Sequence, residues 1–353
     1  MDQRQARTIL GHLKDHARAR RWFGLGANAE ELFDTFTRIH ELADWCPQFA
    51  ATARKFEDAA AAIDDSTPRI RNYLSAALYH HISALGLFED TGQRIGAYRN
   101  CVNAYAQVRD IFRVPAELCE FEYEGFGLTG YLRKAPGVQK APCVVLLRGV
   151  DASREVELHT ISNFMLERGL STFAIDVAGQ GESRFAGFTL APDPSASFGR
   201  ALDYLQTRPE IDAGRFAVVG QSFGGYLAPA IAAREKRLKA CVAMGGFFSL
   251  DDYETPPMAR NNISMNLKIS PEKFDEVKSA FTLEEVIKDL ECPFFALNGS
   301  EDVVIPPSQT VKMYERARCD KKLKIYDGMP HTAYYDNNTI CFDIANWINS
   351  KIY

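Results

Sequence analysis

Residues 216–226 have the sequence FAVVGQSFGGY, and this stretch decides the fold. An apolar, valine-rich run ends at Gly220, Ser222 follows two residues later, and Gly224 and Gly225 precede a helical pattern. A G-x-S-x-G motif between a buried strand and a helix predicts a nucleophile elbow, in which the serine lies at the tip of a sharp turn. Side chains two residues before and after that serine would collide, so both positions favour glycine.

The chain around this motif alternates between apolar runs and amphipathic segments. Apolar runs typical of strands occur at 143–147, 171–177, 215–220, 238–244, 293–298 and 322–326. Helical patterns lie between or after them, near 155–168, 196–207, 223–235, 306–317 and 338–351. This alternation predicts a mostly parallel, doubly wound α/β sheet. In such sheets, ligands bind beyond the carboxyl ends of the strands.

The N-terminal part of the chain, residues 1–115, carries helical patterns only. Asn28 precedes acidic residues, as an N-cap does, and apolar residues then recur at helical spacing over 32–42. Two more helical segments are expected over 70–88 and 98–112. We therefore predict a helical N-terminal domain over residues 1–115.

The pattern changes after that block. Residues 121–132 are typical of an antiparallel hairpin with a glycine turn, and we predict that the α/β domain occupies 116–353. An insertion at 247–290 separates two expected strands, and connections of that length are often functional. Within it, residues 247–268 are expected to be irregular, and residues 282–285 resemble a capping box that opens a helix. We expect this insertion to line the active site.

The chain also contains the partners that a nucleophilic serine needs. A base must accept its proton and an acid must orient that base. In this architecture the order along the chain is serine, acid, histidine. Only His331 among the histidines follows Ser222, and it comes after the last expected strand. Asp302 follows the preceding strand in a glycine-containing turn. Strand ends meet at one rim of the sheet, so we predict the triad Ser222–Asp302–His331.

An oxyanion hole requires two N–H groups beside the nucleophile. The N–H of Phe223 is one candidate, and the N–H of Val150 in the loop after strand 143–147 is the other. Gly149 in that loop permits close approach to the serine. Its neighbour Arg148 either binds an anionic substrate group or forms a structural ion pair. The loop at 176–183 lacks the full G-x-G-x-x-G spacing, so we interpret it as a structural turn rather than a dinucleotide site.

Composition and charge exclude several classes of protein. The chain has 353 residues and a net charge of −5 with both signs interspersed, which favours neither a nucleic-acid nor an anionic-membrane partner. Its 8 cysteines include no C-x-x-C pair, which argues against a zinc site or a redox motif. We expect no metal and no cofactor. No apolar run is long enough to span a bilayer, and no signal-peptide pattern is visible. We expect a cytoplasmic protein that acts on a small molecule.

With these features assembled, the chain resembles the α/β-hydrolases. Within that fold it resembles the group that contains 2,6-dihydroxypseudooxynicotine hydrolase, the fermentation-respiration-switch proteins and the fungal polyketide-shortening yellowish-green hydrolases. The resemblance spans most of the chain. It covers the N-terminal helical block with Trp45 and the helix at 73–88, the loops at 149–155 and 176–182, the elbow, and the Gly-Gly-Phe stretch at 245–247 with residues 251–254. The loop pattern G-x-D-x-S-[KR]-E and the Gly-Gly-Phe stretch are its more specific parts. Arg148 departs from the small or uncharged residue that is more usual.

The resemblance implies that the N-terminal helices form a lid and that the protein is a homodimer. It also implies hydrolysis of a C–C bond in a β-diketone-like or aryl ketone substrate, with an additional acidic residue in the pocket. By its position near the Gly-Gly-Phe stretch, Glu254 takes that role, with Asp251 and Asp252 as rivals. The competing interpretation is a solvated acidic loop.

Two other functions remain open from the sequence. The same triad and acyl-enzyme serve an ester hydrolase or an acyltransferase in natural-product metabolism, because the leaving group alone differs. A catalytically silent hydrolase fold used for binding is the third interpretation, and the intact triad disfavours it.

Overall fold

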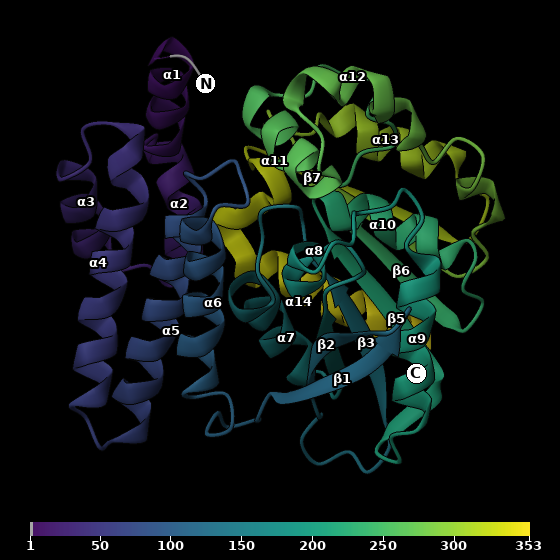
Figure 1. Ribbon diagram of the computed structural model, residues 1–353. Coiled ribbons are helices and arrows are strands. Elements are labelled where there is room, and N and C mark those ends of the chain that lie inside the picture. Colours follow the sequence, from purple (N-terminus) through teal and green to yellow (C-terminus); the bar gives the residue numbers. More distant parts are fainter. Residues whose placement is uncertain (1–2) are drawn as a thin grey trace. The chain divides into compact units, whose positions relative to one another are not determined.

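The computed structural model describes residues 3–353, apart from the side chains of residues 5, 16–19, 333–335 and 337. The chain forms two compact units. The first comprises residues 1–116 together with the short segment 155–157, and the second comprises 117–154 and 158–353 (Figure 1).

The first unit is helical, as predicted. Its helices are α1 (Gln3–Leu13), α2 (His16–Gly24), α3 (Ala29–Thr37), α4 (Leu42–Ala61), α5 (Ser66–Ala84) and α6 (Gly92–Ala106). Asn28 caps α3, because its side chain accepts a hydrogen bond from the N–H of Glu31 at 3.0 Å. The expectation of one apolar periodicity over 32–42 is wrong, because α3 ends at Thr37. The chain restarts at α4, where Glu41 and Asp44 form a capping box.

Aromatic side chains build the core of this helical unit. Trp45 and Phe49 of α4 are fully buried, with ring centroids 4.6 Å apart. The ring of Tyr79 on α5 stacks against Phe49 at 6.2 Å. The indole N–H of Trp45 donates to the carbonyl oxygen of Ile82 at 2.8 Å, which satisfies its one polar atom inside the core. Helices α4 and α5 are therefore held together by packing and by this bond.

The second unit contains an eight-stranded sheet in the order β1-β2-β4-β3-β5-β6-β7-β8. Its strands are β1 (Glu117–Tyr123), β2 (Phe126–Arg133), β3 (Ala141–Leu147), β4 (Ser171–Ile175), β5 (Ile211–Gln221), β6 (Leu238–Met244), β7 (Phe294–Gly299) and β8 (Lys321–Tyr326). β1 and β2 form an antiparallel hairpin, β2 pairs antiparallel with β4, and all other pairs are parallel. The mostly parallel, doubly wound sheet is confirmed. Glu124 and Gly125 form the hairpin turn with positive φ angles of 51° and 76°.

Helices cover both faces of this sheet (Figure 1). One face packs against α9 (Ser195–Gln206), α10 (Phe223–Ala232) and α13 (Pro307–Arg316), and the other packs against α7 (His159–Leu166) and α14 (Asn337–Ile352). Central strands have both faces buried, as their unbroken apolar runs predict. In β3, for example, Val145 faces the first layer and Val144 and Leu146 face the second. The sheet thus holds its strand ends in fixed positions at one rim.

The insertion after β6 differs from expectation in two places. Residues 257–267, expected to be irregular, form the helix α11 (Pro257–Leu267), with a proline at its start. The helix expected at 282–285 is absent from this described segment, where a turn leads into a single 3-10 turn at Ile287–Asp289. Short helical pieces, α12 (Phe274–Val277) among them, complete the insertion. Within the described residues, no helix combines the length and apolarity needed to cross a membrane.

Candidate active site

The predicted nucleophile lies on a strained turn between β5 and α10. Ser222 has φ 57° and ψ −118°, a conformation that costs free energy in any residue with a side chain. Its N–H donates to the carbonyl oxygen of Met244 at 2.8 Å, which ties the turn to β6. A Cβ on Gly220 would lie 1.8 Å from the carbonyl oxygen of Gly224, and one on Gly224 would lie 2.5 Å from that of Leu147. The structure therefore gives the steric reason for both glycines of the motif.

A hydrogen-bonded chain links Ser222 to the other two predicted residues. Nε2 of His331 lies 2.9 Å from Oγ of Ser222, and Nδ1 of His331 lies 2.6 Å from Oδ2 of Asp302. Oδ1 of Asp302 accepts the backbone N–H groups of Val304 and Ile305, each at 2.8 Å. The side chain of Asp302 is fully buried, whereas His331 is 17% exposed. The two backbone N–H groups thus fix the carboxylate through Oδ1 and leave Oδ2 to accept a hydrogen bond from the imidazole.

Backbone contacts between two loops hold the acid and the histidine at the same rim. The N–H of Ser300 donates to Tyr326, and the N–H of Glu301 donates to Met329, both at 2.9 Å. A Cβ on Gly299 would lie 2.0 Å from the carbonyl oxygen of Met329, so only glycine allows these loops to approach. The loop after β7 and the loop after β8 therefore form one rigid piece.

The loop after β3 lies against the serine, as an oxyanion loop must. A Cβ on Gly149 would lie 3.0 Å from Cβ and 3.4 Å from Oγ of Ser222. Val150, which follows, is buried. Phe223 is the first residue of α10, and the first N–H groups of a helix have no partner within the helix. Val150 follows the glycine that lies against Ser222, and Phe223 directly follows Ser222, so both stay the predicted oxyanion donors.

Arg148 lies in a buried ion pair. Its Nε donates to Asp176, and its Nη1 donates to the carbonyl oxygens of Gly149 and Ala152, at 3.2 and 2.8 Å. Nε of Arg154 lies 3.0 Å from the other oxygen of Asp176. Burial alone would raise the pKa of Asp176, but the charges of Arg148 and Arg154 outweigh it and hold that pKa below its usual value. Of the two alternatives for Arg148, the ion pair is the one that the structure shows.

This ion pair joins two of the motifs that carry the family resemblance. Arg154 belongs to the loop pattern at 149–155, and Asp176 begins the loop at 176–182. The pair fixes the first loop behind the nucleophile. The role of Asp176 was missed in the sequence because that loop reads as a simple turn, although an aspartate at the end of a buried strand was a signal.

Replacing Asp176 with asparagine is expected to destabilise the protein by about 3–5 kcal/mol, because Arg148 and Arg154 would keep buried charges without a carboxylate. The stabilisation by Asp176 is present above the unfolded carboxyl pKa of about 3.9 and is lost as the pH falls through the lower folded value. The difference in unfolding free energy between wild type and Asp176→Asn should therefore shrink as the pH is lowered from 7 to 3. Urea unfolding at both pH values measures it, with Asp212→Asn in the surface pair with Arg215 as the control. An Asp176→Asn protein with the unfolding free energy of wild type at pH 7 would contradict this account.

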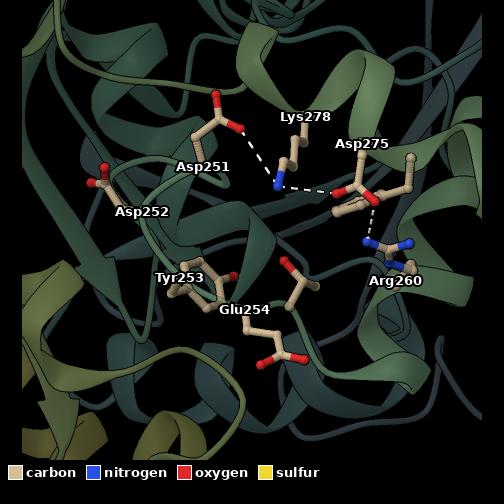
Figure 2. Close-up of a pocket in the computed structure, with 9 residues that line it drawn as sticks. Asp251, Asp252, Tyr253, Glu254, Arg260, Asp275 and Lys278 are labelled. Carbon is tan, nitrogen blue, oxygen red and sulfur yellow. Dashed lines mark hydrogen bonds and ion pairs between the residues drawn. The ribbon is translucent and has the colours of Figure 1, made fainter.

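Glu254 is exposed, and it lines a pocket whose wall contains none of the three triad residues. The pocket has a volume of about 350 Å³ and is lined by Asp251, Asp252, Tyr253, Glu254, Thr255, Arg260, Phe274, Asp275 and Lys278. Figure 2 shows the carboxylate of Glu254 pointing away from the ion pairs around Lys278. Within the described part of the chain, no hydrogen bond or ion pair of this carboxylate is found. Its surroundings are those of the solvated acidic loop that was the competing interpretation.

The two rival acids are engaged in ion pairs. Nζ of Lys278 lies 3.7 Å from Asp251 and 3.0 Å from Asp275, as the dashed lines of Figure 2 show. Asp252 binds Nζ of Lys312 at 2.7 Å. Tyr253, which lies between these acids and Glu254 in the sequence, is half-buried; desolvation raises its pKa, and the charge of Asp302 adds to the rise.

Comparison with known proteins assigns the family. The model of the family described as "Esterase FrsA-like" matches residues 25–253, a range that includes both the oxyanion loop and the elbow. The chain belongs to the FrsA-like esterase family. It also belongs to the prolyl oligopeptidase family, whose model matches residues 160–348. With the sheet described above, these matches show that this FrsA-like protein is an α/β-hydrolase.

Its relatives agree with this assignment. The 2,6-dihydropseudooxynicotine hydrolase of Paenarthrobacter nicotinovorans is 27% identical over 84% of this chain and 82% of its own length. Esterase FrsA of Escherichia coli (strain K12) is also 27% identical, over 92% of this chain and 80% of its own. The crystal structure of 2,6-dihydroxy-pseudo-oxynicotine hydrolase superimposes with a TM-score of 0.84 at 24% identity, over 94% of this FrsA-like protein and 95% of that chain. This likeness establishes the fold.

Among the described residues, no group of three or more His, Cys, Asp or Glu side chains could hold a metal ion. The site described above combines the serine, the imidazole and the carboxylate in one hydrogen-bonded chain.

Proposed function

We propose that this FrsA-like protein is a serine-dependent hydrolase that cleaves a C–C bond of a β-diketone-like or aryl ketone substrate through an acyl-enzyme on Ser222. The hydrogen-bonded chain from Asp302 through His331 to Ser222 carries the proposal. It combines a nucleophile on a strained elbow, a base within reach of its proton and an acid that fixes the tautomer of that base. The implied resemblance supplies the bond type.

The first half of the reaction forms the acyl-enzyme. Nε2 of His331 takes the proton of Ser222 while Oγ attacks the ketone carbon. The N–H groups of Val150 and Phe223 stabilise the negative charge that develops on the carbonyl oxygen. Asp302 stabilises the imidazolium that forms. Collapse of the adduct breaks the C–C bond and leaves its electron pair on the departing carbon, which an adjacent carbonyl or phenol ring stabilises.

The departing carbanion needs a proton, for which two donors were expected. The imidazolium of His331 holds the proton 2.9 Å from the reacting oxygen, whereas Glu254 is exposed on a pocket wall without triad residues. We therefore assign this proton to His331. His331 then accepts a proton from water, which attacks the acyl group and releases the free acid and Ser222.

Ester hydrolysis or acyl transfer is the second candidate. It is favoured by the match to the esterase family over residues 25–253 and by the similarity to Escherichia coli esterase FrsA. The acyl-enzyme would be the same, but the leaving group would be an alcohol. The lid role of the helical unit, the cytoplasmic location and the homodimer remain predictions, and analytical ultracentrifugation tests the last.

A paired turnover assay separates the two candidates. One substrate is an aryl 1,3-diketone and the other is its isosteric aryl ester, with products identified by mass spectrometry. We expect cleavage of the diketone, and we expect Glu254→Gln to retain at least about half of the wild-type rate on it, because His331 supplies the proton. Cleavage of the ester alone would establish the second candidate. A selective loss of diketone cleavage in Glu254→Gln would return the acid role to Glu254.

A further inference from the structure

Helix α11 of the insertion buries an asparagine beside the oxyanion loop. Asn266 lies in the last turn of α11 and is fully buried, as is usual only for polar groups that are hydrogen-bonded. The contacts of Asn266 therefore identify what it is for.

The amide of Asn266 is bonded on both sides. Nδ2 donates to the carbonyl oxygen of Asn262 at 2.7 Å and to the carbonyl oxygen of Val150 at 3.4 Å. Oδ1 accepts a hydrogen bond from Nη1 of Arg184 at 3.3 Å. The two amide hydrogens thus have two acceptors, one on its own helix and one on the oxyanion loop. The bond to Asn262 fixes the amide plane, so the second hydrogen points at Val150.

The backbone of Asn266 adds a third connection. Its carbonyl oxygen accepts the N–H of Leu190 at 3.2 Å. Leu190 packs on the loop after β4, because a Cβ on Gly179 would lie 2.2 Å from its nitrogen. Asn266 therefore ties α11 both to the oxyanion loop and to the loop that begins at Asp176.

The bond to Val150 acts on the geometry of catalysis. The carbonyl group and the N–H of Val150 are attached to the same Cα, so holding the first limits the direction of the second. Gly149, the preceding residue, lies against Ser222. Arg148 holds the carbonyl oxygens of Gly149 and Ala152, and Asn266 holds that of Val150 between them. An oxyanion donor must lie about 2.7–3.1 Å from the developing charge, and a displacement of about 1 Å can cost about 100-fold in rate.

We propose that Asn266 is a positioning residue that orients the Val150 N–H of the oxyanion hole through its hydrogen bond to the Val150 carbonyl oxygen. The inference rests on the proposed function, because it requires Val150 to stabilise an oxyanion. Asn266 itself contacts no reacting atom.

The test compares Asn266→Asp with Asn262→Asp. Aspartate at 266 keeps the acceptor for Arg184 but replaces the donor with an oxygen that faces the carbonyl of Val150. Asn262 lies one turn earlier on α11 and is also buried. Among the described residues, no hydrogen bond from its side chain to the oxyanion loop is found, whereas Asn266 has one to Val150. Asn262→Asp thus makes the same change of charge in the same helix and leaves the hydrogen bond between Asn266 and Val150 in place. Asn266→Ala removes the donor without adding charge and serves as the second variant.

The test has two readouts. The first is kcat and KM on whichever substrate the wild-type protein cleaves, the aryl 1,3-diketone or its isosteric ester. The second is the affinity for an aryl trifluoromethyl ketone. The ketone forms a tetrahedral adduct with a catalytic serine, so its affinity reports on the oxyanion hole. We expect Asn266→Asp to lower kcat about 10-fold to 100-fold with KM within about twofold, and to weaken ketone binding by the same factor. In Asn266→Ala, kcat and the affinity for the ketone should fall in parallel. In Asn262→Asp, neither kcat nor this affinity should change by more than about twofold.

Unchanged kcat in both Asn266 variants would overturn the inference. So would a loss of kcat without a loss of ketone affinity, or equal losses in Asn266→Asp and Asn262→Asp, because these results indicate a merely structural role. A wild-type protein that neither turns over either substrate nor binds the ketone would instead overturn the proposed function, and the inference with it. The wild-type control therefore distinguishes the two failures.

Discussion

Ser222→Ala is expected to lower kcat by about 10⁴–10⁶-fold, since removal of a nucleophile removes covalent catalysis and leaves the oxyanion hole and binding alone. The structure supports so large an effect because Oγ of Ser222 is the atom that meets Nε2 of His331, at 2.9 Å. The variant differs from wild type by one oxygen, and the turn retains its glycines. Steady-state turnover of the cleaved substrate measures the loss.

Two controls separate chemistry from folding in that experiment. The thermal midpoint of Ser222→Ala should lie within about 3 °C of wild type, because no packed atom is lost. Ser249→Ala, at another buried serine of the same unit, should keep wild-type turnover. Retention of more than a hundredth of the wild-type rate in Ser222→Ala would contradict the assignment of the nucleophile.

Asp302→Asn is expected to lower kcat by about 10⁴-fold while KM changes little. The reason lies in how the carboxylate is held. Oδ1 accepts two backbone N–H groups, so asparagine must keep its oxygen there and turn its NH₂ toward Nδ1 of His331. Nδ1 then becomes an acceptor, and the proton moves to Nε2. An imidazole protonated at Nε2 cannot accept the proton of Ser222.

Asp327→Asn is the matched control for this variant. Asp327 lies on the neighbouring loop, is exposed, and has one long hydrogen bond at 3.4 Å to Ser300. The Asp327→Asn variant should therefore have a kcat within about twofold of wild type. The pH dependence of kcat/KM for Asp302→Asn should show activity rising with pH beyond the wild-type plateau, since only hydroxide-assisted removal of the serine proton remains. Equal rates for Asp302→Asn and Asp327→Asn would show that Asp302 does not orient His331.

Much of the fold was predictable because its signals are local. Residues 238–244 were expected as a strand and form β6 with the same bounds, since a short apolar run between helical patterns favours a buried strand of a parallel sheet. The elbow was predictable for the same reason. A strand, a G-x-S-x-G motif and a helix that follow one another permit few arrangements. A side chain at Gly220 or Gly224 would collide with the neighbouring backbone, which shows why both positions are glycine.

The errors lie where tertiary contacts outweigh local patterns. The capping-box pattern at 282–285 does not open a helix because the backbone there pairs elsewhere. The N–H of Leu283 donates to Phe248, and Ser249 forms a bridge with Thr282. In α11, the polar residues Asn262 and Asn266 obscured the apolar period, because both are buried although asparagine is usually exposed. The amide of Asn266 is buried with its hydrogen bonds made to the carbonyl oxygens of Asn262 and Val150.

The site was predictable in part. Ser222, Asp302 and His331 were found because each must follow a strand, in a fixed order, and the structure brings the three side chains together. The acid role of Glu254 came from resemblance alone, and the side chain is exposed. The partners of Arg148 and the contact of Asn266 with the oxyanion loop depend on residues far apart in the chain, which a single sequence does not reveal.

Fluorophosphonate labelling followed by peptide mapping tests the central claim most directly, because the reagent reacts with a serine only when a base activates it. We expect one adduct per chain, on the peptide that contains Ser222. It should be absent in Ser222→Ala and strongly reduced in Asp302→Asn. An unlabelled wild-type protein, or an adduct at another residue that persists in Ser222→Ala, would contradict the claim that this chain is a serine hydrolase acting through Ser222.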